Sequence, residues 1–378
     1  MLYNTLFLRL CNIILLFTMY IVAQSSILYK TVKKEKTMKV YLYSEMQNAI
    51  EKSGVGRAIY HQKNALARQG AELADRYEDA DVVHINTVFP KSYRMAKKLR
   101  KLGIPLVYHA HSTREDFRNS YIGSNLAAEI FKRWIIKCYS TGNVIITPSE
   151  YSKSLLRGYG IKNDIFVISN GIDLEDYRRD ERAGREFREK YGFSETDKVI
   201  VSAGLLMKRK GVHDFAELAR RCPEYKFIWF GDSNLNLVGR EVRQAVKNAP
   251  ENLTFAGYVP KDKIKAALSG SDLFLFPSYE ETEGIIVLEA LAMKIPVLLR
   301  DIPVYGDWIE VGKNAYAARD NDDFERQLRD ILEKRVPDLT EKGYETAVSK
   351  SLDNTGKKLV EAYETAINNV HMTVNSNN

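Results

Sequence analysis

From Met38 onward the chain alternates short apolar runs with amphipathic segments, and it does so twice. Short runs rich in Val, Ile, Leu and Phe are typical of strands buried on both faces. Strands that alternate with helices form parallel sheets covered by helices on each side, so the pattern predicts an α/β protein with two Rossmann-like, doubly wound domains. The predicted strands are 40–43, 82–85, 105–109, 143–147 and 165–169 in the first set, and 199–202, 227–230, 253–256, 272–276 and 296–299 in the second.

A length of 378 residues exceeds what one ordinary hydrophobic core supports, which agrees with two domains. Ligands of doubly wound sheets bind beyond the carboxyl ends of the strands, so functional residues are expected in the loops that follow strands, in a cleft between facing domains. The predicted parts are an apolar extension (1–37), an N-terminal domain (38–172), a C-terminal domain (173–353), a helix that crosses back to the first domain (354–370) and a tail (371–378).

The first 37 residues contain an uncharged run, 10–29, that just reaches the length of a membrane-spanning helix. One Arg precedes this run and four Lys follow it, which would place the C-terminal side in the cytoplasm. Met38 also looks like a natural start, because it leads directly into the first predicted strand. We favour an over-extended start over a functional anchor. The globular part is then expected on the cytoplasmic face of the cell membrane as a peripheral protein.

Composition excludes several classes of protein. The three cysteines, Cys11, Cys138 and Cys222, are far apart and form no CxxC pair, which argues against a disulfide framework and a structural zinc site. The formal charge is +7, and five cations against one carboxylate lie in the first 37 residues. The rest of the chain is only mildly basic, so the charge does not indicate a nucleic-acid partner.

The segment 277–296, PSYEETEGIIVLEALAMKIP, carries the strongest functional signal. Gly284 permits close backbone approach at a helix start, where free N–H groups and the helix dipole suit a diphosphate. Glu281 lies in the loop and Glu289 inside the helix, where an unpaired carboxylate among apolar residues is costly. We therefore assign ligand binding to this pair. For Glu280 and Glu283 we expect only a favourable interaction with the helix dipole.

The E-x7-E spacing followed by A-L-A-x-x-x-P-V resembles the retaining glycosyltransferases of the GT-B fold, family 4 type, and the resemblance covers nearly all of 39–370. The longer strings SYEETEGIIVLEALA and RDIPVY are similar to the bacterial 1,2-diacylglycerol 3-α-glucosyltransferases, which form α-monoglucosyldiacylglycerol from UDP-glucose. The resemblance implies that Glu281 binds the transferred sugar, that Glu289 binds the ribose, and that Gly284 and Ile285 face the diphosphate.

Three consecutive cations, Lys208, Arg209 and Lys210, follow the first strand of the second domain and are placed to bind a diphosphate. Lys210 matches the family's lysine. Leu205 stands where the family usually has an arginine, so Lys208 or Arg209 is expected to substitute. The family also has its interdomain hinge at 170–173, where Asn-Gly forms a tight turn.

Three further groups of candidates follow strands. Gly54 and Gly56 resemble the family's glycine-rich loop, which approaches the donor phosphates and the acceptor. His111 matches the family's histidine at the transferred sugar, whereas His109 is expected to pack inside its strand. Family resemblance assigns the nucleotide base to backbone groups at Gly257 and Tyr258.

No metal site is predicted, because no DxD motif ends a strand. The donor is expected to be UDP-glucose, although glucose and galactose differ at one hydroxyl and the sequence leaves both open. The charge of departing UDP would be neutralised by Lys210, its neighbouring cations and helix N–H groups. No tightly bound cofactor is expected. Retention of configuration is what the resemblance implies.

Diacylglycerol is the expected acceptor, with an anionic membrane surface as partner. The stretch 91–101 is strongly basic with interleaved Tyr93, Met95 and Leu99, and 131–137 places cations beside Trp134. Such helices bind membrane interfaces, at roughly 1 kcal/mol per basic residue, but ordinary surface helices packed on a sheet fit these stretches equally well. The alternatives are the same enzyme class with a polysaccharide, soluble sugar or phosphatidylinositol as acceptor, and a catalytically idle nucleotide-sugar-binding protein.

Overall fold

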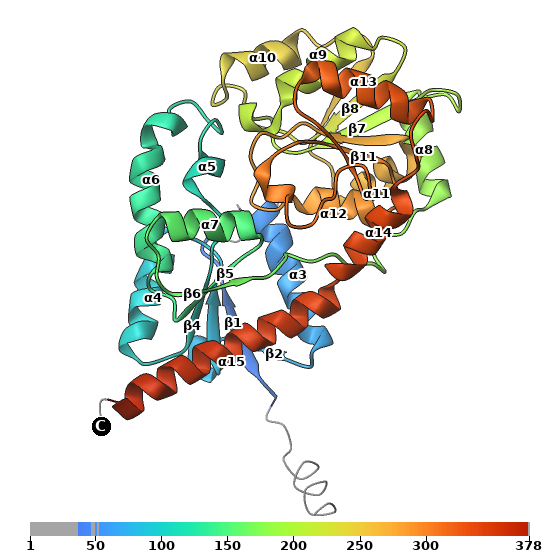
Figure 1. Ribbon diagram of the computed structural model, residues 1–378. Helices are drawn as coiled ribbons and strands as arrows, with labels where there is room; N and C mark the ends of the chain where they lie inside the picture. The colour runs from blue at the N-terminus through green and yellow to red at the C-terminus, as the bar shows by residue number, and fades with distance from the viewer. Residues whose placement is uncertain (1–36, 47–49, 51–52, 377–378) are drawn as a thin grey trace, which may run out of the picture. The chain divides into compact units, whose positions relative to one another are not determined.

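A computed structural model describes residues 37–46, 50 and 53–376, and Figure 1 shows the order of their elements. The first sheet is parallel throughout, with strand order β2-β1-β3-β4-β5-β6. Its strands are β1 (Lys39–Tyr43), β2 (Glu72–Leu73), β3 (Val82–Ile85), β4 (Leu106–His109), β5 (Val144–Thr147) and β6 (Asp164–Val167).

Helices connect the strands of the first sheet, as parallel pairing requires. Several begin at a residue whose side chain caps them: Ser53 accepts from the N–H of Gly56, and Ser149 accepts from the N–H of Ser152. The helices are α3 (Gly54–Arg68), η1 (Tyr77–Asp79), α4 (Pro90–Lys101), α5 (Arg114–Phe117), α6 (Ser124–Tyr139) and α7 (Glu150–Gly158). We call this sheet with its helices, residues 39–171, the N-terminal half.

The second sheet is also parallel, with strand order β12-β11-β10-β7-β8-β9. Its strands are β7 (Val199–Ala203), β8 (Lys226–Phe230), β9 (Leu253–Gly257), β10 (Leu273–Phe276), β11 (Val297–Arg300) and β12 (Tyr316–Ala318). The helices of this C-terminal half, residues 172–351, are α8 (Glu181–Tyr191), η2 (Lys208–Lys210), α9 (Val212–Arg221), α10 (Arg240–Lys247), α11 (Lys261–Gly270), α12 (Ile285–Ala292), η3 (Pro303–Tyr305), α13 (Asn321–Leu332) and α14 (Thr340–Ser349).

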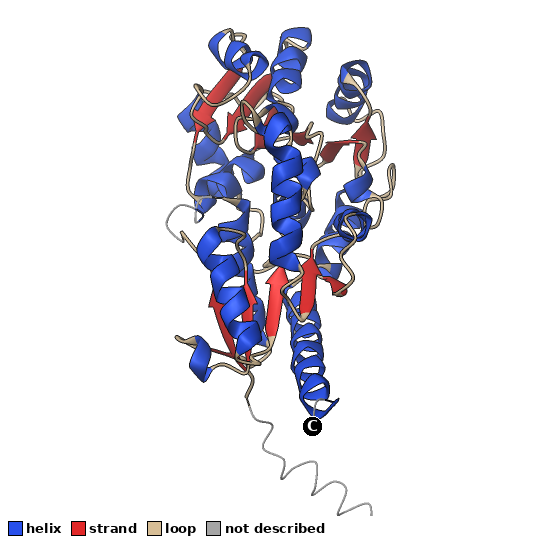
Figure 2. Cartoon of the chain, turned by 90° about the vertical axis from the view of Figure 1, so that its left-hand side faces the viewer, coloured by secondary structure: helices blue, strands red, loops and turns tan. Residues whose placement is uncertain are grey.

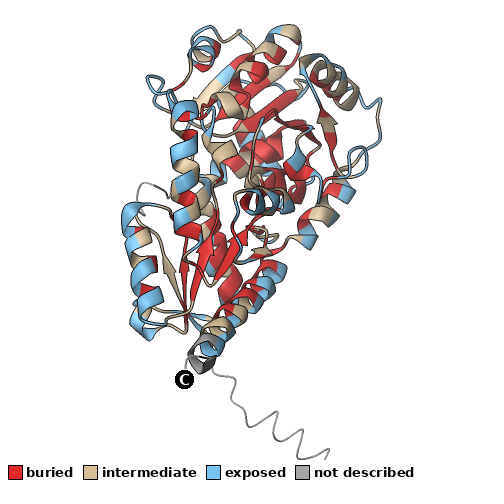
Figure 3. Cartoon of the chain, turned by 60° about the vertical axis from the view of Figure 1, so that its left-hand side comes forward, coloured by how far each residue is buried: buried red, intermediate tan, exposed pale blue. Residues whose placement is uncertain are grey.

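Both faces of the second sheet are apolar and covered. Val199 and Val201 of β7 belong to one buried cluster, whereas Ile200 between them belongs to another, because successive side chains in a strand point to opposite faces. Figure 2 shows helices on both sides of the strands, and Figure 3 shows that burial is concentrated in the strands and the inner helix faces. The predicted two-sheet α/β class is confirmed, and all ten predicted strands overlap an observed one. Strands β2 and β12, with two and three residues, are too short for a periodic signal.

The backbone passes between the halves twice at adjacent points. Ile172 pairs with Ser351 in an isolated parallel bridge, and the N–H of Leu352 donates to the Ile172 carbonyl over 3.0 Å. Gly171 has a φ of 77°, and a Cβ there would lie 2.7 Å from Thr355 Oγ1. This position therefore requires glycine for its backbone conformation and for the close approach of the two segments.

The last helix, α15 (Leu352–Ser376), returns to the N-terminal half and packs on α3 and on strands β3 to β5 (Figure 1). A Cβ at Gly356 would lie 2.4 Å from the Ala65 carbonyl oxygen, so the two helices approach closely at this glycine. Two ion pairs of 2.9 Å join Arg68 of α3 to Asp173 and Asp353. The helix extends to Ser376, beyond the boundary at 370 expected from the sequence.

Candidate functional site

Two loops at the carboxyl ends of neighbouring strands bring the main candidates together. One follows β7 and contains η2 with its three cations. The other follows β10 and leads into α12, with Gly284 as the residue before the helix at a φ of 87°. Strands β7 and β10 are hydrogen-bonded neighbours, so their loops meet at one edge of the sheet, as expected for a site in a parallel α/β fold.

Glu281 is held by two ion pairs and one hydrogen bond from a hydroxyl. Lys210 Nζ donates to Glu281 Oε1, and the Ser278 hydroxyl donates to the same oxygen over 2.6 Å. Arg209 Nη1 lies 3.9 Å from that oxygen. The Glu281 residue is only 7% exposed, so this carboxylate depends on its partners.

The electrostatics of the pair oppose burial. Burial alone would raise the pKa of the Glu281 carboxyl, but Lys210, Arg209 and Ser278 hold that pKa below its ordinary value. Burial lowers the pKa of Lys210, and Glu281 offsets part of this effect. The lowered pKa of Glu281 indicates its charge, because the two cations and the Ser278 hydroxyl all favour the ionised form. The site therefore presents an ionised carboxylate beside a buried cation.

The three predicted cations separate in the structure. The Lys208 side chain is 45% exposed and pairs with Glu241 of α10 over 2.8 Å, away from Glu281. Arg209 instead contacts the N-terminal half, where its Nε donates to the Ser120 hydroxyl over 2.9 Å. Its Nη1 donates to the carbonyl of Glu280, which lies in the same half as Arg209, over 3.0 Å. Of this basic run, Arg209 and Lys210 face the site and Lys208 does not.

A buried ion pair supports the β10 loop from behind. Arg300 donates to Asp214 Oδ2 over 2.9 Å and to the Pro277 carbonyl over 3.0 Å. Arg300 and Asp214 are each only 6% exposed. Gly211, at a φ of 71°, lets the next helix pass against Pro277, since a Cβ there would lie 2.3 Å from the Pro277 oxygen. The position of the loop is thus set by contacts that the sequence motif does not contain.

Glu289 lies fully buried inside α12 and pairs with Arg57 from the first turn of α3. Its carboxylate raises the pKa of Arg57, an effect larger than the opposing effect of burial. Oxygen Oε2 of Glu289 accepts no hydrogen bond from any residue that the structure describes. Arg57 ends the glycine-rich motif of the sequence, which named Gly54 and Gly56 but gave this arginine no role.

Glu283 has a different role from the one expected. It is 1% exposed, and its Oε2 accepts hydrogen bonds from the backbone N–H and the side-chain amide of Asn170, over 2.9 and 2.7 Å. The expectation of a simple interaction with the helix dipole is wrong, because the carboxylate joins the α12 loop to the crossing between halves. Glu280 also contacts the N-terminal half, where the Tyr151 hydroxyl donates to its Oε2 over 3.2 Å.

His111 follows β4 and is partly buried. Its Nε2 bonds to Asn86 Oδ1 over 2.8 Å, and its ring stacks on that of His109 with centroids 3.8 Å apart. Burial lowers the pKa of His111 to about 3, so the imidazole is neutral at neutral pH. His109 is buried within the strand, as expected, and Asn86 was not found from the sequence because an isolated asparagine after a strand carries no motif.

The remaining candidates lie at other strand and helix ends. A Cβ on Gly54 would meet no atom of the described residues within 4 Å. Gly257 ends β9 with a φ of 71°, and its carbonyl accepts from the N–H of Gly231 over 2.8 Å. Tyr258 is 51% exposed, and Ile285 begins α12 directly after Gly284.

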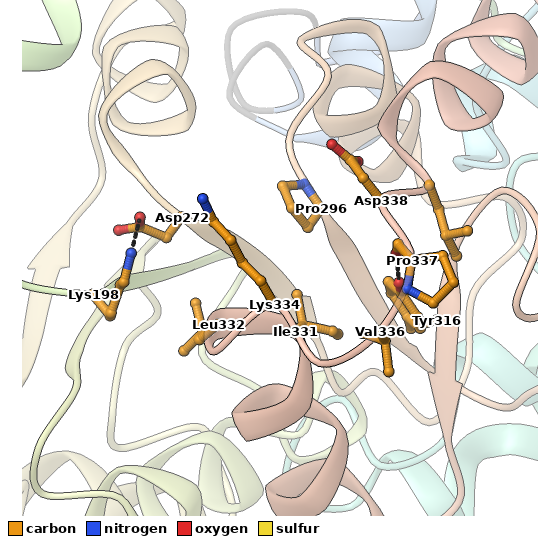
Figure 4. A pocket seen from close by; sticks show the side chains of 11 residues that line it. Lys198, Asp272, Pro296, Tyr316, Ile331, Leu332, Lys334, Val336, Pro337 and Asp338 are labelled. Atoms are coloured by element: carbon orange, nitrogen blue, oxygen red, sulfur yellow. Dashed lines mark hydrogen bonds and ion pairs between the residues drawn. The ribbon is translucent and has the colours of Figure 1, made fainter.

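A cavity of about 270 Å³ lies elsewhere in the C-terminal half (Figure 4). Its lining includes Lys198, Asp272 and Pro296, which precede strands β7, β10 and β11. These are the amino ends of the parallel strands, opposite the edge that carries Lys210 and Glu281. We therefore do not assign this cavity to the candidate site.

Two features are absent from the part of the chain that the structure describes. No group of three or more His, Cys, Asp or Glu side chains in this part of the chain is arranged to hold a metal ion. In the same part of the chain, no helix has both the length and the apolar character that crossing a bilayer requires. The apolar run 10–29 lies outside the described residues.

Comparisons with known proteins agree with the geometry. The family model of glycosyl transferases group 1 matches residues 184–348, and that of glycosyltransferase family 4 matches residues 66–176. Among solved structures, HepE from Anabaena in complex with UDP-glucose aligns at a TM-score of 0.68 with 16% identity, covering 87% of this chain and all of that one. Sucrose-phosphate synthase from Thermosynechococcus elongatus aligns at 0.72 with 14% identity, covering 86% and 98%.

Curated relatives are more informative about the family. The processive diacylglycerol α-glucosyltransferase of Acholeplasma laidlawii is 40% identical over 332 residues, which cover 87% of this chain and 99% of the relative. The α-monoglucosyldiacylglycerol synthase of the same organism is 25% identical and covers 66% and 65%. This chain is thus a glycosyltransferase of the GT-B fold, and it belongs to the family that includes the bacterial diacylglycerol α-glucosyltransferases.

Proposed function

We propose that the protein transfers glucose from UDP-glucose to the 3-hydroxyl of 1,2-diacylglycerol at a membrane surface, with an α linkage. The observation that carries the proposal is the buried contact of Glu281 with Lys210 and Ser278 beside the start of α12. This contact supports assigning a sugar-binding role to the carboxylate and a phosphate-binding role to the cation, at one edge of the sheet. The acceptor is inferred from the relative that is 40% identical over nearly its whole length.

The donor is proposed to lie along the C-terminal half. Glu281 would bind hydroxyls of the glucose, and Glu289 would bind the ribose through Oε2, the oxygen left without a partner among the described residues. The diphosphate would meet Lys210, Arg209 and the free N–H groups at the start of α12. Backbone groups at Gly257 and Tyr258 would bind the base, and Gly54 and Gly56 would approach the phosphates.

The transfer step follows from this placement. The bond between glucose C1 and the diphosphate oxygen breaks, and a bond from C1 to the acceptor 3-oxygen forms on the same face of the sugar. The acceptor proton passes to the departing phosphate, whose charge Lys210 and Arg209 stabilise. Neutral His111 would contact the transferred sugar. In this proposal no protein side chain serves as a covalent nucleophile, and no residue of the chain is assigned to a metal.

The membrane surface is proposed to meet α4 and α6. All six cations of α4 are exposed, but the interleaved Leu99 is fully buried and Tyr93 stacks edge-on against Trp134, with centroids 5.3 Å apart. These apolar residues pack inward, as in an ordinary surface helix. Within α4 and α6, two large apolar side chains are exposed: Leu126 at 89% and Ile130 at 72%, one turn apart on α6.

The same face of α6 continues with exposed Arg133 and Lys137, so it passes from apolar to basic along the helix. Exposed leucine and isoleucine beside cations suit the boundary between acyl chains and anionic headgroups. We propose that this face binds an anionic membrane, which would present diacylglycerol to the site from the cytoplasmic side.

A second transfer is also proposed. The 40% identical relative is named processive, whereas the monoglucosyl synthases are only 25–26% identical to this chain. We therefore expect the glucosylated lipid to be accepted again, so that a diglucosyl lipid accumulates after the monoglucosyl product. A time course of labelled products separates one-step from two-step transfer.

The test is an assay with radiolabelled UDP-glucose and diacylglycerol in anionic micelles, with NMR of the product linkage. A labelled glycolipid with an α linkage is expected, and Glu281→Gln should abolish its formation while the circular dichroism spectrum is retained. Absence of a glycolipid, with transfer to a soluble sugar, a polysaccharide or phosphatidylinositol, would replace the acceptor. UDP binding without transfer to any acceptor would instead indicate the catalytically idle alternative.

A further inference from the structure

A continuous series of hydrogen-bonded side chains runs from α15 along one face of the first sheet. The Tyr363 hydroxyl lies 2.7 Å from His84 Nδ1. On the other side of that ring, His84 Nε2 lies 3.2 Å from His109 Nδ1. The His84 and His109 rings are nearly parallel, with centroids 5.2 Å apart and an angle of 2°.

The series continues to His111 through two amides. Gln62 Nε2 lies 3.0 Å from His109 Nδ1 and donates to Asn86 Oδ1 over 2.8 Å. The same oxygen of Asn86 lies 2.8 Å from His111 Nε2. We call these six side chains the histidine column; they are Tyr363, His84, His109, Gln62, Asn86 and His111.

Burial makes the protons of the column interdependent. Five of its side chains are at most 3% exposed, and His111 is partly buried. Burial lowers the pKa of His84 to about 3 and that of His109 well below its ordinary value, so both rings are neutral. A neutral imidazole has one N–H and one lone pair, and an unmatched buried contact is costly. The tautomer of each ring therefore constrains the next.

Two arrangements give each contact in the column a donor and an acceptor; in both, His109 Nδ1 shares its single lone pair or its single proton between His84 and Gln62, and His109 Nε2 has no partner among the described residues. In one, Tyr363 donates, His84 and His109 are protonated on Nε2, the Gln62 amide donates in both directions, and His111 donates from Nε2 to Asn86. In the other arrangement, the side-chain amides of Gln62 and Asn86 are rotated by 180°, so that their oxygen and nitrogen atoms exchange places. Each donor in the first arrangement is then an acceptor, and His111 is protonated on Nδ1. A phenol is a stronger acid than a neutral imidazole N–H, so Tyr363 donating is the favoured arrangement.

We propose that Asn86, Gln62 and Tyr363 are positioning residues that fix His111 as its Nε2–H tautomer. The Nδ1 lone pair of His111 then remains available as an acceptor. Through this column, α15 acts on the reacting region along the face of the first sheet that α15 and α3 cover. The inference rests on the proposed function, because that function places His111 at the transferred sugar.

The direct readout is the tautomer itself. The chain has six histidines, so nitrogen-15 labelling of histidine gives few signals, and His111→Gln identifies the one of interest. In the wild type we expect the His111 signals of the Nε2–H form. Tyr363→Phe and Asn86→Leu should each give a mixture of tautomers. A His111 signal identical to the wild type in both variants would overturn the proposal without reference to activity.

Kinetics provide a second readout. Losing one orienting hydrogen bond in Tyr363→Phe should lower kcat roughly three- to tenfold and leave the KM for UDP-glucose unchanged. Tyr108→Phe is the matched control, because this buried tyrosine donates to the Thr87 carbonyl over 2.7 Å and lies outside the column. Equal losses of kcat in the two variants would show a merely structural role and reject the proposal.

The experiments distinguish an error in the proposal about the histidine column from an error in the proposed function. If His111→Ala retains full kcat, the assignment of His111 to the sugar is wrong, whatever its tautomer. If His111→Ala is inactive and Asn86→Leu has the kcat and the His111 signals of the wild type, the column is wrong and the assignment stands. A glycolipid assay that detects no product with the wild type rejects the function alone.

Discussion

Arg57 of α3 and Glu289 of α12 form an ion pair that joins the glycine-rich start of the first helix to the predicted ribose-binding carboxylate. Glu289 is fully buried, while the Arg57 side chain is 28% exposed. The pair occupies one carboxylate oxygen and leaves Oε2 without a partner among the described residues. A guanidinium at this point pairs with the buried carboxylate and orients it, which is what recognition of a ribose hydroxyl requires.

The first prediction concerns this pair. Arg57→Met should weaken binding of UDP roughly tenfold or more, because the buried Glu289 loses the cation that pairs with it and orients it. Arg57→Lys should recover part of the affinity, since it restores the charge but not the planar fork. Isothermal titration with UDP measures both. An unchanged Kd in Arg57→Met would separate the pair from nucleotide binding.

The second prediction uses two neighbouring lysines as a matched pair. Lys210→Met should lower kcat/KM for UDP-glucose by about a hundredfold or more, because the cation is buried against Glu281 and would face the diphosphate. Lys208→Met should stay within about twofold, since the pair it forms with Glu241 is exposed and such pairs contribute little. Steady-state kinetics on both variants check this, and similar losses in the two would contradict the separation seen in the structure.

The third prediction concerns pH. Burial raises the pKa of Glu280 to about 7 and that of Asp116 to about 6. Both carboxyls are therefore protonated in the folded state at pH values where the unfolded chain is already ionised. Their contribution to stability is fully present below their ordinary values, 4.5 and 3.8, and is lost as the pH rises through about 6 to 7.

The free energy of unfolding should thus decrease between pH 5 and pH 8. Glu280→Gln, which cannot ionise, should make that decrease smaller. Urea denaturation at the two pH values measures the difference. The same slope in wild type and variant would show that Glu280 does not titrate in this range.

The fourth prediction concerns the membrane face. The double variant Leu126→Glu and Ile130→Glu should abolish binding to vesicles that contain anionic lipid, because it places two charges where apolar groups would enter the interface. Activity on diacylglycerol in vesicles should fall with it, while the affinity for UDP should not change. Val348→Glu is the control, since this exposed valine lies on α14 of the C-terminal half. Flotation of the variant with the vesicles, as efficient as that of the wild type, would assign membrane binding to another surface.

Much of the fold follows from local pattern. Every predicted strand was confirmed within a residue or two, because a buried parallel strand is a short apolar run with polar ends. The short edge strands β2 and β12 were missed, since two or three residues carry no period. Glu281 and Lys210 were predicted from their position after strands, and the structure brings them into contact.

The sequence could not determine which charged side chains contact one another when they lie far apart along the chain. The sequence by itself determined two parallel sheets and a site at their carboxyl ends, because apolar periodicity and glycine positions act locally. Only the tertiary structure decided that Arg57 reaches Glu289, that Glu283 holds Asn170 and that Lys208 turns to Glu241. The physical reason is burial: a carboxylate removed from water must take the donors that packing places beside it, and packing joins residues that are far apart in sequence.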